Sequence, residues 1–229
     1  MCGRYTLTSP AEVLRNLFGF PERPNLQACY NIAPTTSIAA VRKTAADGER
    51  HFFSAHWGLI PPFAKSADIG VKMINARSET VTEKPSFRAA FKSRRCLIPA
   101  NGFYEWEKKG PKEKQPWLIG LNEAPLFAFA GLWEEWQGPQ GEQVRSCTIL
   151  TTTAAESIRF IHPRMPVILD PENYDDWLNG SSGTDLLRPA SPERLCYYPV
   201  ANRVGNVRND DAGLLEPLEK EEPDQKSLF

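Results

Sequence analysis

The residue with the most specific chemistry in this sequence is Cys2, in the opening segment MCGRYTL. Cysteine at this position is small enough for Met1 to be removed, and removal leaves an α-amine and a thiol on one residue. An α-amine, with a pKa of about 7.7 to 8.0, is partly neutral near pH 7 and can form a Schiff base with an aldehyde. The neighbouring thiol can then close a five-membered thiazolidine ring, which an internal cysteine or lysine cannot do. Cys2 therefore predicts reactivity toward aldehydes, although cysteines are also common as small buried apolar residues.

The two residues after Cys2 are compatible with this chemistry. Gly3 permits another backbone to approach closely. Arg4 is near enough to hold a phosphate or to lower the pKa of the thiol.

A carboxylate in the segment GFYEWEK is a candidate acid. Strand alternation places Glu105 on one face and Tyr104 and Trp106 on the other. If Glu105 faces the interior, desolvation raises its pKa toward that of a useful general acid. Pairing with a surface lysine such as Lys108 is an equally good interpretation.

Two further segments carry amide, imidazole and guanidinium groups. The sequence NAR places Asn75 and Arg77 at the end of a strand, and IHPRMP presents His162 and Arg164 in a rigid segment. Histidine can transfer protons near neutral pH. A turn cap at Asn75 and a hydrogen-bonded loop histidine at position 162 remain alternatives.

The composition indicates a single domain over residues 1–210, followed by a flexible acidic tail over residues 211–229. The chain has 229 residues, 41% hydrophobic and 24% charged, with a net charge of −1. The tail holds six acidic and two basic residues, so the rest of the chain has a net charge of +3. This mildly basic body permits a groove for a polyanion but does not require one.

Several classes of protein are disfavoured. The sequence shows no apolar run of membrane length and no signal-peptide pattern, so we expect a cytoplasmic protein. Five scattered cysteines and three histidines match neither a disulfide framework nor a metal site. We therefore expect reduced thiols, no metal and no cofactor.

Twenty prolines and many short apolar segments predict an α+β fold. The expected architecture is a curved, mainly antiparallel β-sheet or open barrel with short surrounding helices. Strands are expected at 37–43, 51–59, 71–75, 95–100, 102–108, 116–121, 125–136, 145–152 and 166–169. Helices are expected at 9–19, where Ser9 caps and Gly19 ends the helix, at 85–93, at 153–161, and at 170–180, where Asp170 caps and Gly180 ends it.

Seven segments together resemble the SOS response-associated peptidase (SRAP) family. They are MCGRY, YNIAPT, WGLIP, INARSET, CLIPANGFYEWEK, IHPRMPVIL and VGNVRND, in the order in which the family has them. They span most of residues 1–210. The resemblance implies the SRAP fold and a protein that recognises abasic sites in single-stranded DNA, becomes covalently attached to them and so shields the lesion during the DNA damage response. An opened abasic sugar carries an aldehyde, the group that a terminal aminothiol selects.

The resemblance also implies roles for individual residues. Cys2 matches the nucleophile of the family. Asn75 is expected to orient the terminal amine, Glu105 to protonate the sugar oxygen, and His162 to assist the Schiff-base and dehydration steps. Arg4, Arg77 and Arg164 match positions that grip the phosphates flanking the lesion.

Aromatic and loop residues complete the predicted DNA-binding set. Phe63 stands where the family commonly has a tryptophan, which predicts a smaller stacking wedge. Trp106, beside the candidate acid, lines either the pocket or the core. Asn31 and Pro34, in YNIAPT, match a loop near the family's active site, with packing as an equal alternative.

The last five residues, QKSLF, resemble the short peptide by which bacterial proteins dock on the replication sliding clamp. Its anchors would be Gln225, Leu228 and Phe229. A solvated tail is the more common interpretation of such a short match.

Two other functions stay open. Cys2, His162 and Asn75 also make the set of a thiol peptidase, whose activity could be limited to removing Met1. A reversible DNA-binding module is the third hypothesis, which would leave the acid, amide and imidazole without a role. We expect the chain to act as a monomer.

Overall fold

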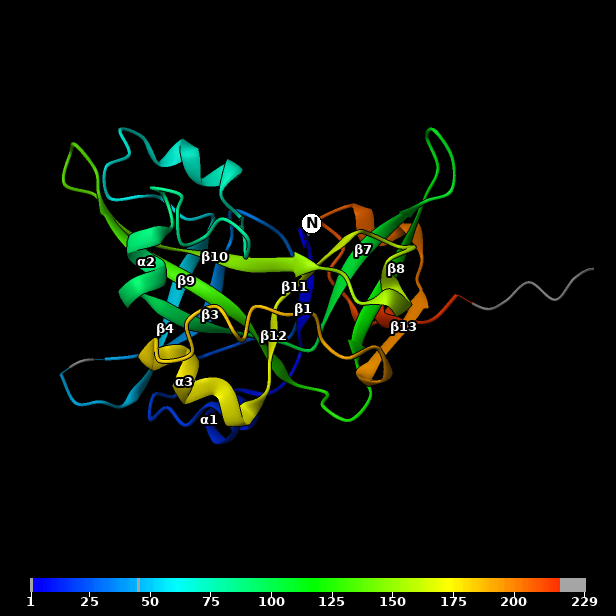
Figure 1. Cartoon of the computed structure of the whole chain (residues 1–229). Helices are drawn as coiled ribbons and strands as arrows, with labels where there is room; N and C mark the ends of the chain where they lie inside the picture. The colour runs from blue at the N-terminus through cyan, green and yellow to red at the C-terminus, as the bar shows by residue number, and fades with distance from the viewer. Residues whose placement is uncertain (1, 45, 219–229) are drawn as a thin grey trace, which may run out of the picture.

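Two mainly antiparallel sheets form the framework of the protein, as a computed structural model of residues 2–44 and 46–218 shows (Figure 1). The smaller sheet has five strands in the order β13-β8-β7-β1-β2. Its strands are β1 (Tyr5–Leu7), β2 (Cys29–Ile32), β7 (Gly102–Lys108), β8 (Lys114–Leu121) and β13 (Leu195–Pro199). The strand that begins just after Cys2 is therefore held between β7 and β2.

The larger sheet closes on itself. Its order is β11-β10-β4-β3-β6-β9-β12, and an additional pairing of β9 with β10 joins β10, β4, β3, β6 and β9 into a barrel. The strands are β3 (Ser37–Lys43), β4 (Arg50–Trp57), β5 (Asn75–Arg77), β6 (Arg95–Ala100), β9 (Phe127–Gln137), β10 (Gln143–Thr153), β11 (Arg164–Pro166) and β12 (Ile168–Leu169). This α+β fold with antiparallel sheets and a barrel confirms the predicted fold class.

Short helices surround the sheets, as expected: α1 (Ala11–Phe18), α2 (Arg88–Ser93) and α3 (Tyr174–Asn179). Gly19 and Gly180 end α1 and α3 in the left-handed conformation that glycine adopts readily. The predicted cap at Ser9 is wrong, because Pro10 occupies the N-cap position of α1. Asp170 does occupy the N-cap position of the 3₁₀ turn Pro171–Asn173 that leads into α3, but its side chain makes no capping hydrogen bond. Asn101 donates to the Ser9 hydroxyl at 2.8 Å, and the Asp170 carboxylate pairs with Arg194 at 2.5 Å.

Two predicted elements differ from the structure. The segment 71–75, expected as a strand, begins in the 3₁₀ helix Ala67–Lys72 and continues through two irregular residues, and pairing begins at Asn75. The helix expected at 153–161 is reduced to a single 3₁₀ turn, Glu156–Ile158. Both segments belong to connections between barrel strands, whose path is decided by contacts distant in sequence.

Aromatic rings join the two sheets. The Tyr5 ring of β1 is fully buried and lies 5.3 Å from the ring of Trp57 and 5.8 Å from that of Phe129 in edge-to-face arrangements. Phe103 of β7 lies 6.0 Å from Phe129. Buried aromatic pairs of this geometry add about 0.5–1.5 kcal/mol beyond burial of apolar area. They fix the beginning of the chain against the barrel.

The segment after β13 packs on the outer face of the five-stranded sheet, with Leu214 buried in a cluster beside Tyr104 and Leu118. It includes the 3₁₀ turn Ala212–Leu215, and a bridge pairs Val200 with Pro217. The expectation that a flexible tail begins at position 211 is therefore wrong for residues 211–218. Residues 219–229, including QKSLF, lie outside the described residues.

None of the helices in the described ranges combines the length and apolar character needed to cross a lipid bilayer.

Candidate active site

Cys2 is fully buried at the start of β1, and its backbone is held on two sides. The Asn75 side-chain amide donates to the Cys2 carbonyl oxygen at 2.8 Å. Two residues on, the Tyr104 amide of β7 donates to the Arg4 carbonyl at 2.9 Å. Asn75 is itself fixed because β5 pairs in parallel with β10, in register with Ile149. The structure thus brings two of the predicted site residues into contact.

Glu105 and His162 form the second part of the site. The Glu105 side chain is buried on β7, and its Oε1 lies 3.9 Å from His162 Nδ1. The Arg164 backbone contacts the same ring nitrogen twice, with its nitrogen at 3.0 Å and its carbonyl oxygen at 3.1 Å, so this short segment fixes the position of the imidazole ring. His162 precedes β11, which pairs with the end of β10. The five-stranded sheet therefore supplies Glu105, and the larger sheet positions His162.

The environment of Cys2 disfavours a thiolate. Complete burial raises the pKa of the Cys2 thiol well above its usual range, and the negative charge of Glu105 raises it further. The Glu105 carboxylate is therefore near enough to influence the Cys2 thiol electrostatically.

Arg4 lies on the opposite face of the small sheet from Glu105, where it is held by a fixed set of acceptors. Its Nη1 donates to Asn31 Oδ1 and to the Val204 carbonyl, each at 2.9 Å, and its guanidinium lies 5.9 Å from the centre of the Trp106 ring. Burial lowers the pKa of Arg4 from its ordinary value. Trp106 is therefore a support for Arg4 as well as a candidate lining residue.

Asn31 is 5% exposed and links Arg4 to the segment after β13. Its amide lies within hydrogen-bond distance of three carbonyl oxygens, at 3.2, 3.1 and 2.7 Å; they belong to Val204, Asn206 and Asn209. Its hydrogen-bonding groups are therefore used within the protein. The geometry favours the packing alternative for Asn31, with a function through Arg4.

The other two predicted phosphate ligands lie on short strands that pair with β10, Arg77 on β5 and Arg164 on β11. Arg77, at the end of β5, is exposed. Arg164 donates to both oxygens of Glu79 and, at 2.6 Å, to the Thr151 carbonyl. Glu79 and Thr151 were not predicted from the sequence. An acidic residue two positions after Arg77 was the available signal for Glu79.

Phe63 is 64% exposed on the connection between β4 and β5, which projects beside the start of β1 (Figure 1, cyan). The base of this connection is narrow, since a Cβ on Gly70 would lie 2.6 Å from the Gly58 carbonyl oxygen. The Trp136 indole donates to the Ala64 carbonyl at 2.8 Å. Phe63 is therefore an exposed ring on a well-supported loop.

Pro34 lies in the loop that follows β2, at the edge of a cavity of ≈ 640 Å³ that Arg4 and Asn31 also line. The next residue, Thr35, has a φ of 68°, a left-handed conformation that a β-branched residue rarely adopts. Such backbone strain is common at binding sites. Pro34 thus borders the cavity beside Arg4 and Asn31.

All five cysteines are in the free thiol form. Within residues 2–44 and 46–218, no group of three or more His, Cys, Asp or Glu side chains is arranged to hold a metal ion.

Comparisons with known proteins identify the family of this chain. The family profile described as "SOS response associated peptidase (SRAP)" matches residues 1–207. The abasic site processing protein YoqW of Bacillus subtilis (strain 168) is 42% identical over 225 residues, covering 94% of this chain and 99% of that protein. The abasic site processing protein HMCES of Gallus gallus is 31% identical, covering 96% of this chain and 78% of that protein.

Solved structures share the fold. A crystal structure of a protein from Bacteroides thetaiotaomicron superposes with a TM-score of 0.84 at 26% identity, covering 94% of this chain and 99% of that one. A protein from Bordetella bronchiseptica gives a TM-score of 0.76 at 28% identity, covering 87% and 100%. Together with the matched profile and relatives, these similarities establish that the chain belongs to the SRAP family.

Proposed function

We propose that this protein processes abasic sites in single-stranded DNA by forming a thiazolidine crosslink through Cys2 after Met1 has been removed. One observation carries the proposal. The buried residue 2 is held by the Asn75 amide and lies near the Glu105 carboxylate, which in turn faces His162. The names of the relatives YoqW and HMCES point to the same substrate class.

The chemistry balances with these groups alone. The ring-opened abasic sugar presents an aldehyde at C1. The neutral α-amine of Cys2 adds to this carbon, and loss of one water gives an imine. The neutral thiol then adds its sulfur to the same carbon, and its proton moves to the nitrogen. No oxidant is needed, and one water is released for each crosslink.

Side chains around residue 2 supply the proton transfers. Glu105 protonates the sugar ring oxygen and opens the ring, and His162 assists formation and dehydration of the carbinolamine. Asn75 fixes the Cys2 carbonyl and so orients the amine. The 3.9 Å between Glu105 and His162 allows a proton to pass between them with a small movement.

Binding of the flanking strand relies on charge and stacking. Arg4, Arg77 and Arg164 hold phosphates, and Phe63 stacks with a base next to the lesion. Trp106 reaches the strand together with Arg4, and Pro34 limits the site at the loop after β2. Asn31 contributes indirectly by holding Arg4. We expect the chain to act as a monomer in the cytoplasm.

The crosslinking test uses a single-stranded oligonucleotide with one uracil, treated with uracil-DNA glycosylase. The wild-type chain is expected to give a band that survives SDS and heat, and Cys2→Ala is expected to abolish it. The matched control is Cys196→Ala, which removes a half-buried thiol at the far edge of the small sheet. An undiminished Cys2→Ala adduct would exclude the proposal, as would the absence of any adduct with the mature wild-type chain.

A thiol peptidase is the second candidate, since Cys2, His162 and Asn75 occur together. Mass spectrometry of the Cys2→Ser and His162→Ala chains, produced by cell-free translation without methionine aminopeptidase, tests it. Met1 retained in these variants but lost in the wild type would establish self-processing.

A contact between the QKSLF tail and a sliding clamp is a separate proposal, and these residues lie outside the described part of the structure. It rests on Gln225, Leu228 and Phe229 alone. A pull-down with purified clamp compares the full chain with one ending at Asp224. Equal retention of both chains would dismiss the contact.

A further inference from the structure

We propose that Trp117, Phe160 and Tyr197, which we call the aromatic trio, form a stacking subsite for an unpaired nucleobase of the strand that carries the lesion. This inference rests on the proposed function and deepens it. It assigns a second aromatic contact to the site, on the side of Cys2 opposite Phe63.

The rings of the trio contact one another between the five-stranded sheet and the connection that follows β10. The ring centres of Trp117 and Phe160 lie 5.3 Å apart with the planes at 88°, and those of Phe160 and Tyr197 lie 5.9 Å apart at 61°. Trp117 and Tyr197 belong to β8 and β13, and Phe160 comes from the connection between β10 and β11. This arrangement leaves Phe160 with 51% of its surface exposed.

Exposure of an aromatic ring is unusual in this protein. Across residues 2–44 and 46–218, the large apolar side chains with high exposure are Val13, Phe63, Val71, Phe160, Val207 and Leu218. Phe63 and Phe160 are the two aromatic residues of this set. A single exposed apolar side chain is ordinary, whereas clustered apolar surface marks interaction sites, and Phe160 is clustered with two further rings.

The trio lies next to the catalytic pair. Phe160 is two residues before His162, and Trp117 is the direct cross-strand neighbour of Glu105 in the β7–β8 register. Directly opposed residues of antiparallel strands point to the same face with their Cβ atoms about 4.5–5.5 Å apart. A base bound at the trio is therefore within reach of a strand whose abasic sugar is at Cys2.

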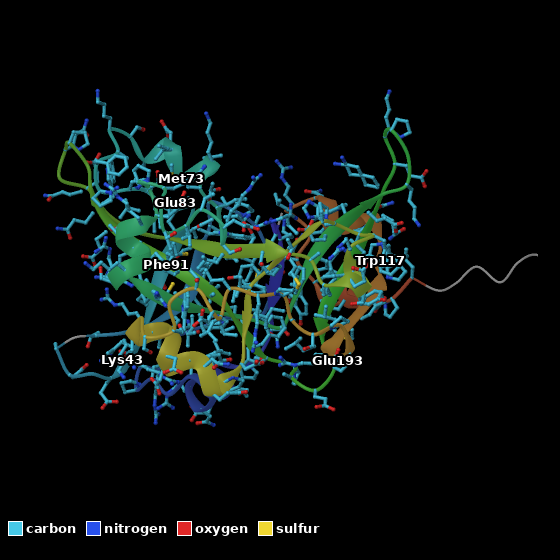
Figure 2. All side chains as sticks on the ribbon, in the orientation of Figure 1. Lys43, Met73, Glu83, Phe91, Trp117 and Glu193 are labelled. Carbon is cyan, nitrogen blue, oxygen red and sulfur yellow. The ribbon has the colours of Figure 1, made fainter. Side chains whose placement is uncertain are left out.

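The trio and the Phe63 loop lie on different sides of the first strand. In Figure 1 the β4–β5 connection that carries Phe63 is on one side of the marked N-terminus, and β8 and β13 are on the other. Figure 2 shows the same separation, with Met73 of that connection and Trp117 of β8 labelled on opposite sides. A strand that crosses residue 2 can therefore meet an aromatic ring on either side of the lesion.

Cations accompany the trio. Arg159, next to Phe160, has 57% of its side chain exposed and pairs with Glu156 at 2.9 Å. Lys109 of the β7–β8 hairpin is 48% exposed and pairs with Glu107 at 2.8 Å, while the Trp117 indole donates to the same carboxylate at 3.0 Å. The Arg159–Glu156 pair is exposed on both sides and contributes little to stability, so Arg159 can turn to a DNA phosphate at small cost. Aromatic faces beside such cations are typical of sites for single-stranded nucleic acid.

A structural role for Phe160 would give a different experimental result from a role in stacking with a base. The ring could serve as an anchor that holds the His162 segment against the small sheet. Loss of an anchor would lower the rate of crosslinking at saturating DNA, whereas loss of a stacking ring would weaken DNA binding and leave that rate unchanged.

Two substitutions separate these roles. Phe160→Leu retains an apolar side chain against Trp117 but removes the aromatic face, and Phe160→Trp retains an aromatic face. Val13→Ala, on α1, is the control for loss of an exposed apolar side chain elsewhere. Affinity is measured by fluorescence anisotropy with a labelled, lesion-free oligothymidylate of ~12 nucleotides at fixed salt. The crosslinking rate is measured in single turnovers with the abasic strand.

We expect Phe160→Leu to weaken oligothymidylate binding by at least about five-fold, the low end for loss of one stacked base. Phe160→Trp and Val13→Ala should bind within about two-fold of wild type, and the saturated crosslinking rate of Phe160→Leu should be unchanged.

Equal affinity of Phe160→Leu and wild type would overturn the subsite, and so would a lower saturated rate without a change in affinity, which identifies an anchor. A wild-type chain that binds oligothymidylate through Phe160 but forms no adduct would refute the proposed crosslinking and retain the subsite. A normal adduct with no effect of Phe160→Leu on binding would do the reverse, and absence of binding by the wild type would exclude both.

Discussion

Replacement of Asn31 by alanine tests how the site holds its first arginine. Asn31 accepts one hydrogen bond from Arg4 and lies within hydrogen-bond distance of three carbonyl oxygens of the segment 204–209. A side-chain amide has two N–H groups, so two of these carbonyl contacts are strong at one time. The substitution leaves the guanidinium and the carbonyls without this partner in a poorly hydrated region.

The magnitude follows from those contacts. Loss of a neutral hydrogen bond costs about 0.5–1.5 kcal/mol, and loss of one to a charged group about 1.5–3 kcal/mol. Because Arg4 keeps the Val204 carbonyl at 2.9 Å and is partly exposed, the lower values apply. We expect Asn31→Ala to lower the free energy of unfolding by about 3 kcal/mol. For a domain of this size the melting temperature should fall by roughly 6–12 °C.

Urea unfolding of Asn31→Ala, Arg4→Ala and the double variant isolates the link between the two residues. We expect a coupling energy of at least about 1 kcal/mol. Asn101→Ala is the matched control, because Asn101 also makes several hydrogen bonds, to Thr8, Ser9 and Pro125, but none of them to Arg4. Effects of Asn31→Ala and Arg4→Ala that add within about 0.5 kcal/mol would refute the reasoning.

Three further outcomes are expected. Gly70→Ala places a Cβ 2.6 Å from a facing backbone carbonyl and should lower stability by about 1–3 kcal/mol and weaken single-strand binding through displacement of the Phe63 loop; unchanged urea and anisotropy curves would contradict this. A hydrogen bond to Glu22 raises the pKa of His51 from its ordinary 6.5, so its stabilisation is complete below pH 6.5 and is lost as pH rises through the folded-state pKa. The urea midpoint of His51→Gln should therefore fall less than that of wild type above pH 6.5, and parallel curves would argue against it. Glu79 competes with phosphate for Arg164, so Glu79→Gln should tighten oligothymidylate binding by up to about five-fold, and weaker binding would show that the carboxylate instead positions the arginine.

The local pattern of residue types was enough to predict many of the strands in the two sheets. The strands at 37–43, 95–100 and 102–108 have the predicted bounds because each is a run of apolar and β-branched residues between turn signals. Strands β1, β2 and β13 were not predicted. They have three to five residues, and pairing with neighbours far along the chain creates them.

The sequence indicated which residues form the candidate site, but not the contacts that hold them in position. The order of family segments indicated Cys2, Asn75, Glu105 and His162; in the structure Asn75 contacts Cys2, and Glu105 lies 3.9 Å from His162. The partner of Arg4 is a carbonyl 200 positions away, which no local pattern reveals. The segment VGNVRND was recognised as a motif without a role, and its backbone proves to hold Arg4 and Asn31. The aromatic trio was not predicted for the same reason, because its rings come from β8, from β13 and from the connection between β10 and β11.

The central claim is that the α-amine and thiol of residue 2 together capture the lesion. Intact-mass measurement of the adduct with an abasic oligonucleotide tests it most directly. The account predicts the mass of the chain without Met1 plus that of the oligonucleotide, less one water, with the modification mapped to Cys2. It also predicts no adduct for a chain in which an added residue keeps residue 2 internal. An adduct of normal yield on a chain that retains Met1 would contradict the account.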